Sequence, residues 1–343
     1  RTAVSVSASS DWSRNSLGGE VGLDQYEYFS VAGAHYTDWH VGIQGGYTIS
    51  DEQLTLGYSH QSYHQLGAAI GTVSSATPVS DNTDTAQVQY PLDLGRFGVT
   101  PDGSVSFYRY GSATVDGTRL DQEYLNRTVY AGGVTGRYTM TGFGSLLVVA
   151  RATDARYPHR LAGLPTNNSR NFMLLTGADY HADGPWHYRL LVGGEISTFS
   201  AAEYRTRVSP TVEGNVTWTP TALTTVIGTI SRSVNDPLAA GVNGDTLNSA
   251  SLQIDRELLR NIVLEGRGGF QYAQYFSGGG TQSSYTFGGS INYLANRALH
   301  VSLDVDYIDQ SSASVAIRSG RIIGSQLTGF TQLIAGVTLH IAL

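Results

Sequence analysis

Apolar and polar residues alternate along almost the whole chain. In the stretch INYLANRALHVSLDVDY, residues 291–307, apolar side chains at every second position of 299–307 alternate with polar ones. A period of two is typical of a β-strand whose two faces differ in polarity. We count about 17 such segments, and residues 104–114 can be phased either way. No long stretch keeps a period of 3.6, so the pattern predicts an all-β chain. Clear segments are 4–12, 39–50, 86–94, 186–196, 205–218, 262–272 and 331–343.

The connections between these segments alternate in length. Short ones lie at 48–53, 219–222, 255–261 (DRELLRN) and 294–298, and long ones, rich in Gly, Ser, Asn, Asp or Pro, lie at 66–83, 155–168, 233–246 and 308–329. Each unit is therefore a hairpin with a short turn on one side and a long loop on the other. No linker or shift in composition interrupts the series, and we expect a single domain over residues 1–343.

The apolar face of each strand can be buried in a soluble core or in lipid. A soluble sandwich of this many strands would need Greek-key or crossover connections of varied length. A propeller would give four strands per repeat with continuous apolar inner strands, whereas this pattern gives two alternating strands. Short turns on one side, long loops on the other and aromatic residues near strand ends are typical of a transmembrane barrel. We therefore predict an up-and-down antiparallel transmembrane β-barrel of about 16–18 strands.

Composition narrows the choice further. The formal net charge is −7, only 14% of residues are charged, and all 21 basic residues are Arg. This balance argues against a nucleic-acid partner. The chain has no Cys, which excludes disulfides and thiolate sites. The sequence contains no run of about 18 apolar residues, so it predicts no transmembrane helix.

The strand count raises a question of parity. If residues 13–16 form a short periplasmic turn, segment 4–12 starts on the outer side. A barrel with both ends in the periplasm needs an even number of strands, so we expect 18 with a preceding strand, or 16 if one segment is overcounted. The chain opens on the alternating stretch RTAVSVSASSDW without a signal peptide. We take this as a mature or trimmed N-terminus.

Several turns carry a family resemblance. The stretches SDWSRNSL (10–17), 209–237, 252–275 and 285–311 resemble the putative outer-membrane β-barrel porin family of alphaproteobacteria, type 2. Three turn motifs of the family occur here. The Trp-x-Pro-Thr-x-Leu-Thr-Thr motif corresponds to Trp218 to Thr225, and the Asp-x-Glu-Leu-Leu-Arg-Asn motif to Asp255 to Asn261. The Tyr-Leu-Leu-Asn-Arg motif corresponds to Tyr293 to Arg297, with Ala295 in place of the second Leu. The resemblance implies a Gram-negative outer-membrane porin whose substrate is unassigned. Some members lie beside exopolysaccharide genes, which implies at most an export role.

The polar faces supply candidate lumen residues. We interpret them first as solvated side chains paired across strands. In the alternative, facing rows of arginines and acids set a transverse field or bind sugar or phosphate groups. Candidates are Arg127, Arg137, Arg151, Arg189, Arg205, Arg207, Arg267, Asp93, Glu195, Glu213, Glu265, Asp304 and Asp306.

Aromatic residues near strand ends are candidates for the membrane girdles. No residue pattern indicates an enzyme, a cofactor or a metal site, because His60 and His64 alone supply too few ligands and no nucleophile turn occurs. The girdle candidates are Trp39, Tyr47, Tyr58, Trp186, Trp218, Tyr272, Tyr293 and Tyr307.

Together these patterns predict an outer-membrane channel for diffusion of small polar solutes. Two alternatives stay open: an export port for a secreted polysaccharide, and a structural or adhesive barrel with partner-binding loops. Expected partners are outer-membrane lipid and lipopolysaccharide, and other envelope or polysaccharide-export proteins. Loop 308–329, with Arg318 and Arg321, could fold inward and narrow the pore, or lie outside and bind a partner.

Overall fold

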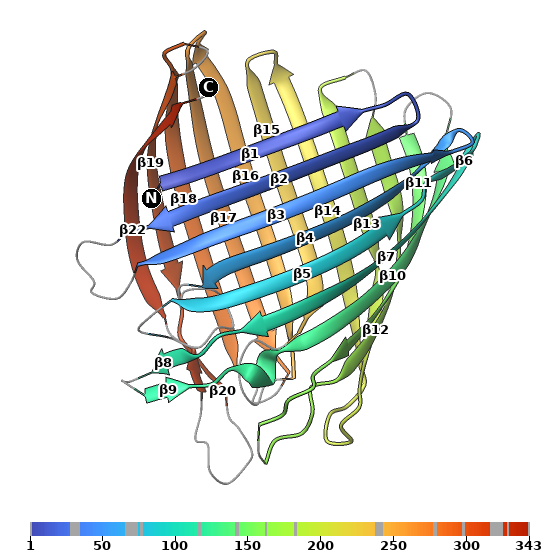
Figure 1. Ribbon diagram of the computed structural model, residues 1–343, viewed down its shortest axis with the longest axis vertical. Coiled ribbons are helices and arrows are strands. Elements are labelled where there is room, and N and C mark those ends of the chain that lie inside the picture. Colours follow the sequence, from blue (N-terminus) through green and yellow to red (C-terminus); the bar gives the residue numbers. More distant parts are fainter. Residues whose placement is uncertain are drawn as a thin grey trace.

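A computed structural model gives the fold of this chain (Figure 1). It describes residues 2–27, 35–65, 75, 78–115, 118–140, 144–161, 163–181, 184–236, 243–276, 280–296, 299–315, 325–327 and 329–341. Nearly all of these residues lie in β-strands. The one helix among them is a single 3-10 turn, η1 (Glu123–Leu125). No helix in the described ranges is both long enough and apolar enough to cross a membrane.

Within the described residues, eighteen strands form the main sheet, and two small hairpins, β8–β9 and β20–β21, stand apart from it. The strands are β1 (Thr2–Asp11), β2 (Asn15–Tyr26), β3 (Tyr36–Ile49), β4 (Glu52–Gln65), β5 (Val79–Gln89), β6 (Leu92–Leu94), β7 (Phe97–Tyr110), β8 (Ala113–Val115), β9 (Thr118–Leu120), β10 (Arg127–Thr139), β11 (Gly144–Arg156), β12 (Ser169–His181), β13 (Trp186–Phe199), β14 (Arg207–Thr221), β15 (Thr224–Asn235), β16 (Asp245–Leu259), β17 (Ile262–Tyr275), β18 (Thr281–Leu294), β19 (Leu299–Gln310), β20 (Ala313–Val315), β21 (Ser325–Leu327) and β22 (Phe330–Ile341).

Every long strand pairs antiparallel with the next long strand along the chain, which confirms the up-and-down order. Three-residue β6 follows β5 after a break at Tyr90 and Pro91, and both pair with β7. If β6 is counted as the end of β5, the eighteen strands of the main sheet become seventeen long strands. This number equals the number of alternating segments counted from the sequence. Among the described residues, β1 pairs only with β2 and β22 only with β19.

The two ends of the strands differ in their connections. Short turns such as 50–51 and 222–223 lie at one end, which we call the turn end, and the longer connections lie at the other, the loop end. Figure 1 shows the hairpin β8–β9 at the loop end and the C-terminus at the turn end. The prediction that DRELLRN, 255–261, forms a turn is wrong: β16 continues to Leu259, and only residues 260 and 261 turn. The pairing register of β16 with β17 shifts between Glu257 and Leu259, so one residue of β16 is unmatched in this ladder and strict alternation is interrupted there. For this reason the period of two does not reveal the end of β16.

The two faces of the sheet separate polar from apolar side chains, because cross-strand partners share a face. Leu303 pairs with Ile291 on β18 and Val337 on β22, and all three are among the exposed large apolar side chains. We call this the outward face. The other face carries Arg267 and Asp306, and we call it the inward face because it is concave, as the contacts below show.

A sharp fold in the sheet makes the inward face concave. Adjacent strands lie about 4.8 Å apart, so β10 and β15 would be roughly 24 Å apart in a flat sheet. Yet Arg127 at the start of β10 lies 3.2 Å from Asp236, which directly follows β15. Arg151 on β11 likewise forms an ion pair with Glu213 on β14, across two intervening strands. The sheet must therefore bend through β11–β14.

Glycines permit this bend at β12 and β13. Gly177 and Gly193 are inward positions that pair across these strands with Leu191 and Leu175. A Cβ atom at Gly177 would lie 1.8 Å from the carbonyl oxygen of Leu190, and one at Gly193 would lie 1.9 Å from that of Leu174. Only glycine allows so close an approach of two backbones. The resulting corner is filled by inward apolar side chains, namely Leu147, Val149, Leu175 and Leu191, with Met173 against them.

Some predictions fall on parts of the chain that the structure does not describe. Arg318 and Arg321 lie outside the described residues, as do residues 316–324 and 328 of loop 308–329. The two outcomes expected for loop 308–329 therefore stay predictions.

Candidate functional site

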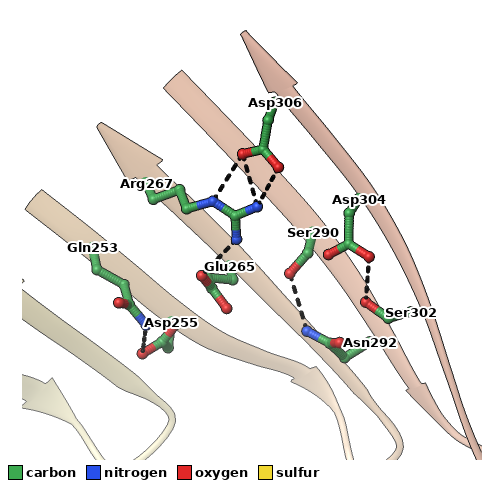
Figure 2. Close-up of polar contacts among 9 residues, drawn as sticks. All are labelled: Gln253, Asp255, Glu265, Arg267, Ser290, Asn292, Ser302, Asp304 and Asp306. Carbon is green, nitrogen blue, oxygen red and sulfur yellow. Dashed lines mark hydrogen bonds and ion pairs between the residues drawn. The ribbon is translucent and has the colours of Figure 1, made fainter. Parts of the chain in front are cut away.

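A polar strip crosses the inward face of β16–β19 (Figure 2). At its centre the Arg267 guanidinium donates to the Asp306 carboxylate from Nε (3.0 Å to Oδ1) and Nη2 (2.8 Å to each oxygen). Its Nη1 donates to Glu265 at 3.0 Å. One arginine thus holds two carboxylates from β17 and β19. The planar fork of a guanidinium is suited to this two-sided pairing.

Gly288 on β18 makes the central contact possible. It pairs with both Arg267 and Asp306 in the ladder, so it lies directly between them on the same face. A Cβ atom at this position would lie 2.2 Å from Asp306 Oδ1 and 2.6 Å from Arg267 Nε. Because Gly288 has no side chain, the surface of β18 has a gap at this position, and the Arg267 side chain extends across the strand there.

Further along the strip, shorter polar side chains bond within their own strands. Ser302 donates to Asp304 at 3.0 Å, and the Gln253 amide donates to both oxygens of Asp255 at 3.1 Å. Figure 2 shows these groups in parallel rows on neighbouring strands. Asp304 and Asp306 differ in one respect: the structure pairs Asp306 with an arginine, whereas Asp304 accepts from a neutral hydroxyl.

The inward face of β1–β5 forms a second polar wall. Small and polar side chains surround a hollow of about 430 Å³, which its glycines widen. In Figure 1 these strands cross in front of β15–β19, so the sheet folds into two walls joined through β11–β13. The inward residues lining this hollow include Ser7, Ser9, Glu20, Gln44, Ser59 and Gln87.

A compact group of charged and aromatic residues lies at the loop end. Arg127 lies 4.2 Å above the ring of Tyr108, donates to the hydroxyl of Tyr110 at 3.1 Å, and forms its ion pair with Asp236. Burial raises the pKa of the Asp236 carboxyl, and the neighbouring Arg127 only partly opposes this shift. Tyr157 lies nearby, and burial raises its pKa well above the usual value. This group connects the two sides of the fold in the sheet.

The structure pairs most of the predicted lumen residues. Arg151 contacts Glu213 across the corner, and Arg137 lies 3.3 Å from Asp93. Glu195 is almost fully buried and accepts from the backbone N–H of Val234 at 3.4 Å, an interaction across β14.

Three predicted arginines stand apart from these pairs. Arg189 occupies an inward position opposite Asp179 and Asn215 and is exposed. Arg207 begins β14 and lies 4.1 Å above the ring of Phe276, to whose carbonyl oxygen it also donates. Arg205 precedes β14 and lies in the connection at the loop end, not on a strand.

The predicted girdle residues lie on the outward face near both strand ends, with one exception. Trp186 and Trp218 stack at the turn end with ring centroids 5.0 Å apart, and Tyr47 and Tyr293 lie at the same end. Trp39, Tyr272 and Tyr307 lie nearer the loop end. Tyr58 lies in the middle of β4, where its hydroxyl donates to Asp84 at 2.8 Å.

Sequence reasoning missed Asp236 and the inward apolar corner. Asp236 sits in a segment read as a long loop, and no spacing rule connects it with Arg127, 109 residues earlier in the chain. The corner had a visible signal: the run LLVV at 146–149 is apolar on both faces. Among the described residues, no group of three or more His, Asp or Glu side chains is placed to hold a metal ion.

Comparison with known proteins agrees with this architecture. The FrpB iron transporter from Neisseria meningitidis has a TM-score of 0.54 and 9% identity, covering 92% of this chain and 65% of that chain. The ferric-catecholate import receptor Fiu from E. coli K12 has a TM-score of 0.52 and 9% identity, covering 98% of this chain and 74% of that one. The copper transporter OprC has a TM-score of 0.52 and 9% identity, with coverages of 98% and 71%.

At such low identity these similarities concern the fold, and this chain spans just under two thirds of the FrpB chain. No curated protein matches the sequence. The family model described as putative beta-barrel porin 2 matches residues 1–321. With that match over most of its 343 residues, and with the barrel fold of Gram-negative outer-membrane transporters, the chain belongs to this family of outer-membrane β-barrels.

Proposed function

We propose that the barrel is a channel through which small polar solutes diffuse across the outer membrane, along its mixed-charge inward face. The carrying observation is the polar strip on β16–β19. Arg267 and Asp306 pair there but remain 38% and 33% exposed, so both keep contact with solvent on the concave side. Charged groups that stay hydrated on a concave surface indicate a wet passage and not a packed core.

The filled corner and the polar walls support a route for this proposed passage. Leu147, Val149, Leu175 and Leu191 leave no room for solute at β11–β13. The hollow on β1–β5 and the strip on β16–β19 are polar surfaces away from this corner. Solutes would pass between these two walls, and the Arg127–Asp236 group would narrow the route at the loop end.

Conductance in planar lipid bilayers tests the proposal. Purified, folded protein should produce ion currents that rise with salt concentration, and proteoliposomes should admit small neutral sugars. In this proposal the barrel is not an enzyme, and it needs no cofactor. Folded protein that inserts without conducting ions would contradict an open channel.

A deletion strain separates this proposal from the two alternative functions. Loss of surface polymer with unchanged uptake of small solutes would redirect the proposal to a polysaccharide export port with periplasmic partners. Stable co-purification with one envelope protein, together with absent conductance, would favour a structural or adhesive barrel. Slower uptake of small hydrophilic solutes, with normal surface polymer, is the result that the diffusion channel predicts.

A further inference from the structure

An arginine pair lies on the outward face at the loop end. Its side chains do not line the lumen, so the proposed channel function does not account for them. Arg156 is the last residue of β11, and Arg170 is the second residue of β12. Both share a face with exposed Tyr130 and Phe172 and not with the inward Arg151. Long loops of outer-membrane barrels are extracellular. The pair therefore lies at the level of the outer leaflet.

Asp154 holds the two guanidinium groups together. Its Oδ2 lies 3.0 Å from Nη2 of Arg156 and 3.4 Å from Nε of Arg170. Arg156 also lies over the ring of Tyr130, at 5.2 Å from the centroid. Two cations share one carboxylate, so the cluster keeps a net positive charge. The side chains of Arg156 and Arg170 are 60% and 76% exposed, which leaves N–H donors of both free to face outward.

An apolar groove of about 440 Å³ begins beside this cluster. Its floor is the small pair Gly132 and Ala152, and its walls are Phe172 and Ile196. Arg170 and Asp154 form its polar end. Moving along β12 toward the turn end, the outward positions change from Arg170 to Phe172 to Leu174, so the surface changes from charged to apolar over two rows.

We propose that this cluster and groove bind one phosphorylated glycolipid of the outer leaflet, of the lipid A type. Arg156 and Arg170 would donate to a phosphate monoester, and one acyl chain would lie in the groove over Gly132 and Ala152. Charge complementarity favours this occupant, because arginine forks recognise phosphate through paired, charge-assisted hydrogen bonds. The groove provides apolar contact at the depth where an acyl chain begins. A soluble anion would use only the arginines and leave the groove without a role.

Native mass spectrometry of the protein in detergent micelles, titrated with purified lipid A, tests this site. The wild-type protein should retain one lipid A, and the double variant Arg156→Gln/Arg170→Gln should bind at least about tenfold more weakly, roughly 1.4 kcal/mol. The matched control Arg260→Gln removes an exposed arginine from the turn end and should bind as the wild type does. Equal affinity of the double variant and the wild type would overturn the proposal.

Two further comparisons separate the phosphate from the acyl chain. Dephosphorylated lipid A should bind the wild type about as weakly as lipid A binds the double variant, and equal binding of both lipids would refute phosphate recognition. Ala152→Phe should fill the groove and weaken lipid A binding with both arginines intact. Ala150→Phe, on the same outward face two residues away and outside the groove, should not. If the two phenylalanine variants bind lipid A alike, the groove is not the acyl site.

Discussion

Arg267 and Asp306 are joined by three hydrogen bonds across the intervening strand β18, at the one inward position of that strand that has no side chain. The strands that carry them are two ladder steps apart, about 9.6 Å. Each of the two side chains therefore extends over Gly288 to meet the other. This relationship links the stability of the polar wall to a glycine that has no polar function itself.

Gly288→Ala should break the two-pronged contact while leaving the sheet assembled. The new Cβ would displace the flexible ends of Arg267 and Asp306. Because the ion pair is partly exposed, we expect a loss of only about 1 kcal/mol in unfolding free energy. Urea unfolding monitored by tryptophan fluorescence measures it. The control is Gly266→Ala, where a Cβ would meet nothing within 4 Å; a loss as large as that of Gly288→Ala would show that the pair is not responsible.

Arg267→Gln should shift ion selectivity toward cations. Removing the guanidinium leaves the carboxylates of Glu265 and Asp306 uncompensated on the inward wall. Reversal potentials under a salt gradient report the change, which should be largest at low ionic strength because salt screens these charges. Arg232 pairs with Val212 on the outward face, so Arg232→Gln removes the same charge outside the passage. A selectivity shift of equal size in Arg232→Gln would place the conducting path elsewhere.

Leu303→Arg and Asp304→Arg should behave in opposite ways, although they alter adjacent residues. A cation on the lipid-facing side near mid-depth costs about 2–4 kcal/mol, so Leu303→Arg should impair membrane assembly. Val305→Arg should do the same, since Val305 is also on the exposed outward face. Asp304→Arg places its cation on the polar wall and should be tolerated. Heat-modifiable migration of membrane fractions on gels compares the three, and equal folded yields would refute the assignment of faces.

Acid should loosen the loop end through Asp236. Its folded pKa is raised by burial, so the carboxylate is protonated at a higher pH than an ordinary Asp, and its attraction for Arg127 is lost as the pH falls through that value. Open-channel conductance should therefore increase at acidic pH, with a midpoint above the usual range for Asp. Tyr157, Asp245 and Glu195 lie around the same site and stay unchanged in the test variant. Asp236→Asn should abolish the step, and a step that persists would assign it to another group.

The same pKa shift of Asp236 affects folding stability in the opposite direction: acid weakens the ion pair with Arg127, but protonation of this carboxyl favours the folded state. Because the folded pKa of Asp236 is higher than its unfolded pKa, the folded state binds more protons between the two values. This carboxyl alone therefore lowers stability as the pH rises from the unfolded to the folded pKa. Its contribution in acid is favourable even though its ion pair is lost.

The alternation of apolar and polar residues was enough to predict the up-and-down order of the strands, and its count of about 17 segments matches the seventeen long strands. The expectation of 16 strands, with one segment overcounted, is not borne out. The alternation assigned Leu303 and Asp304 to opposite faces because successive residues of a strand point to opposite sides of the sheet. The outward side is apolar and the inward side is polar, so the two residue types can be told apart. The alternation placed Arg267 and Asp306 on one face but could not pair them, since that depends on the register of three strands. The absent side chain of Gly288 becomes meaningful only once the register is known.

The corner and the loop-end group could not be derived in this way. Leu147 and Val149 are apolar on the face where the pattern predicts polar residues, because the bend at Gly177 and Gly193 excludes water there. Arg127 meets Asp236 only after the sheet has folded, and no local rule connects residues on strands so far apart in the ladder. Contacts of this kind depend on global curvature and not on local spacing.

The number of long strands is odd, and this determines how the two edge strands, β1 and β22, could be joined. Since direction reverses at every step, β1 and β22 run the same way. A direct hydrogen-bonded junction between them would be the sole parallel pairing in the main sheet, with evenly spaced, slanted bonds. An antiparallel junction would instead require a further strand between the two edges. Exposed backbone polar groups are costly in hydrocarbon. Among the described residues β1 pairs only with β2 and β22 only with β19, so a lateral opening of this wall between these two edges would break the fewest hydrogen bonds.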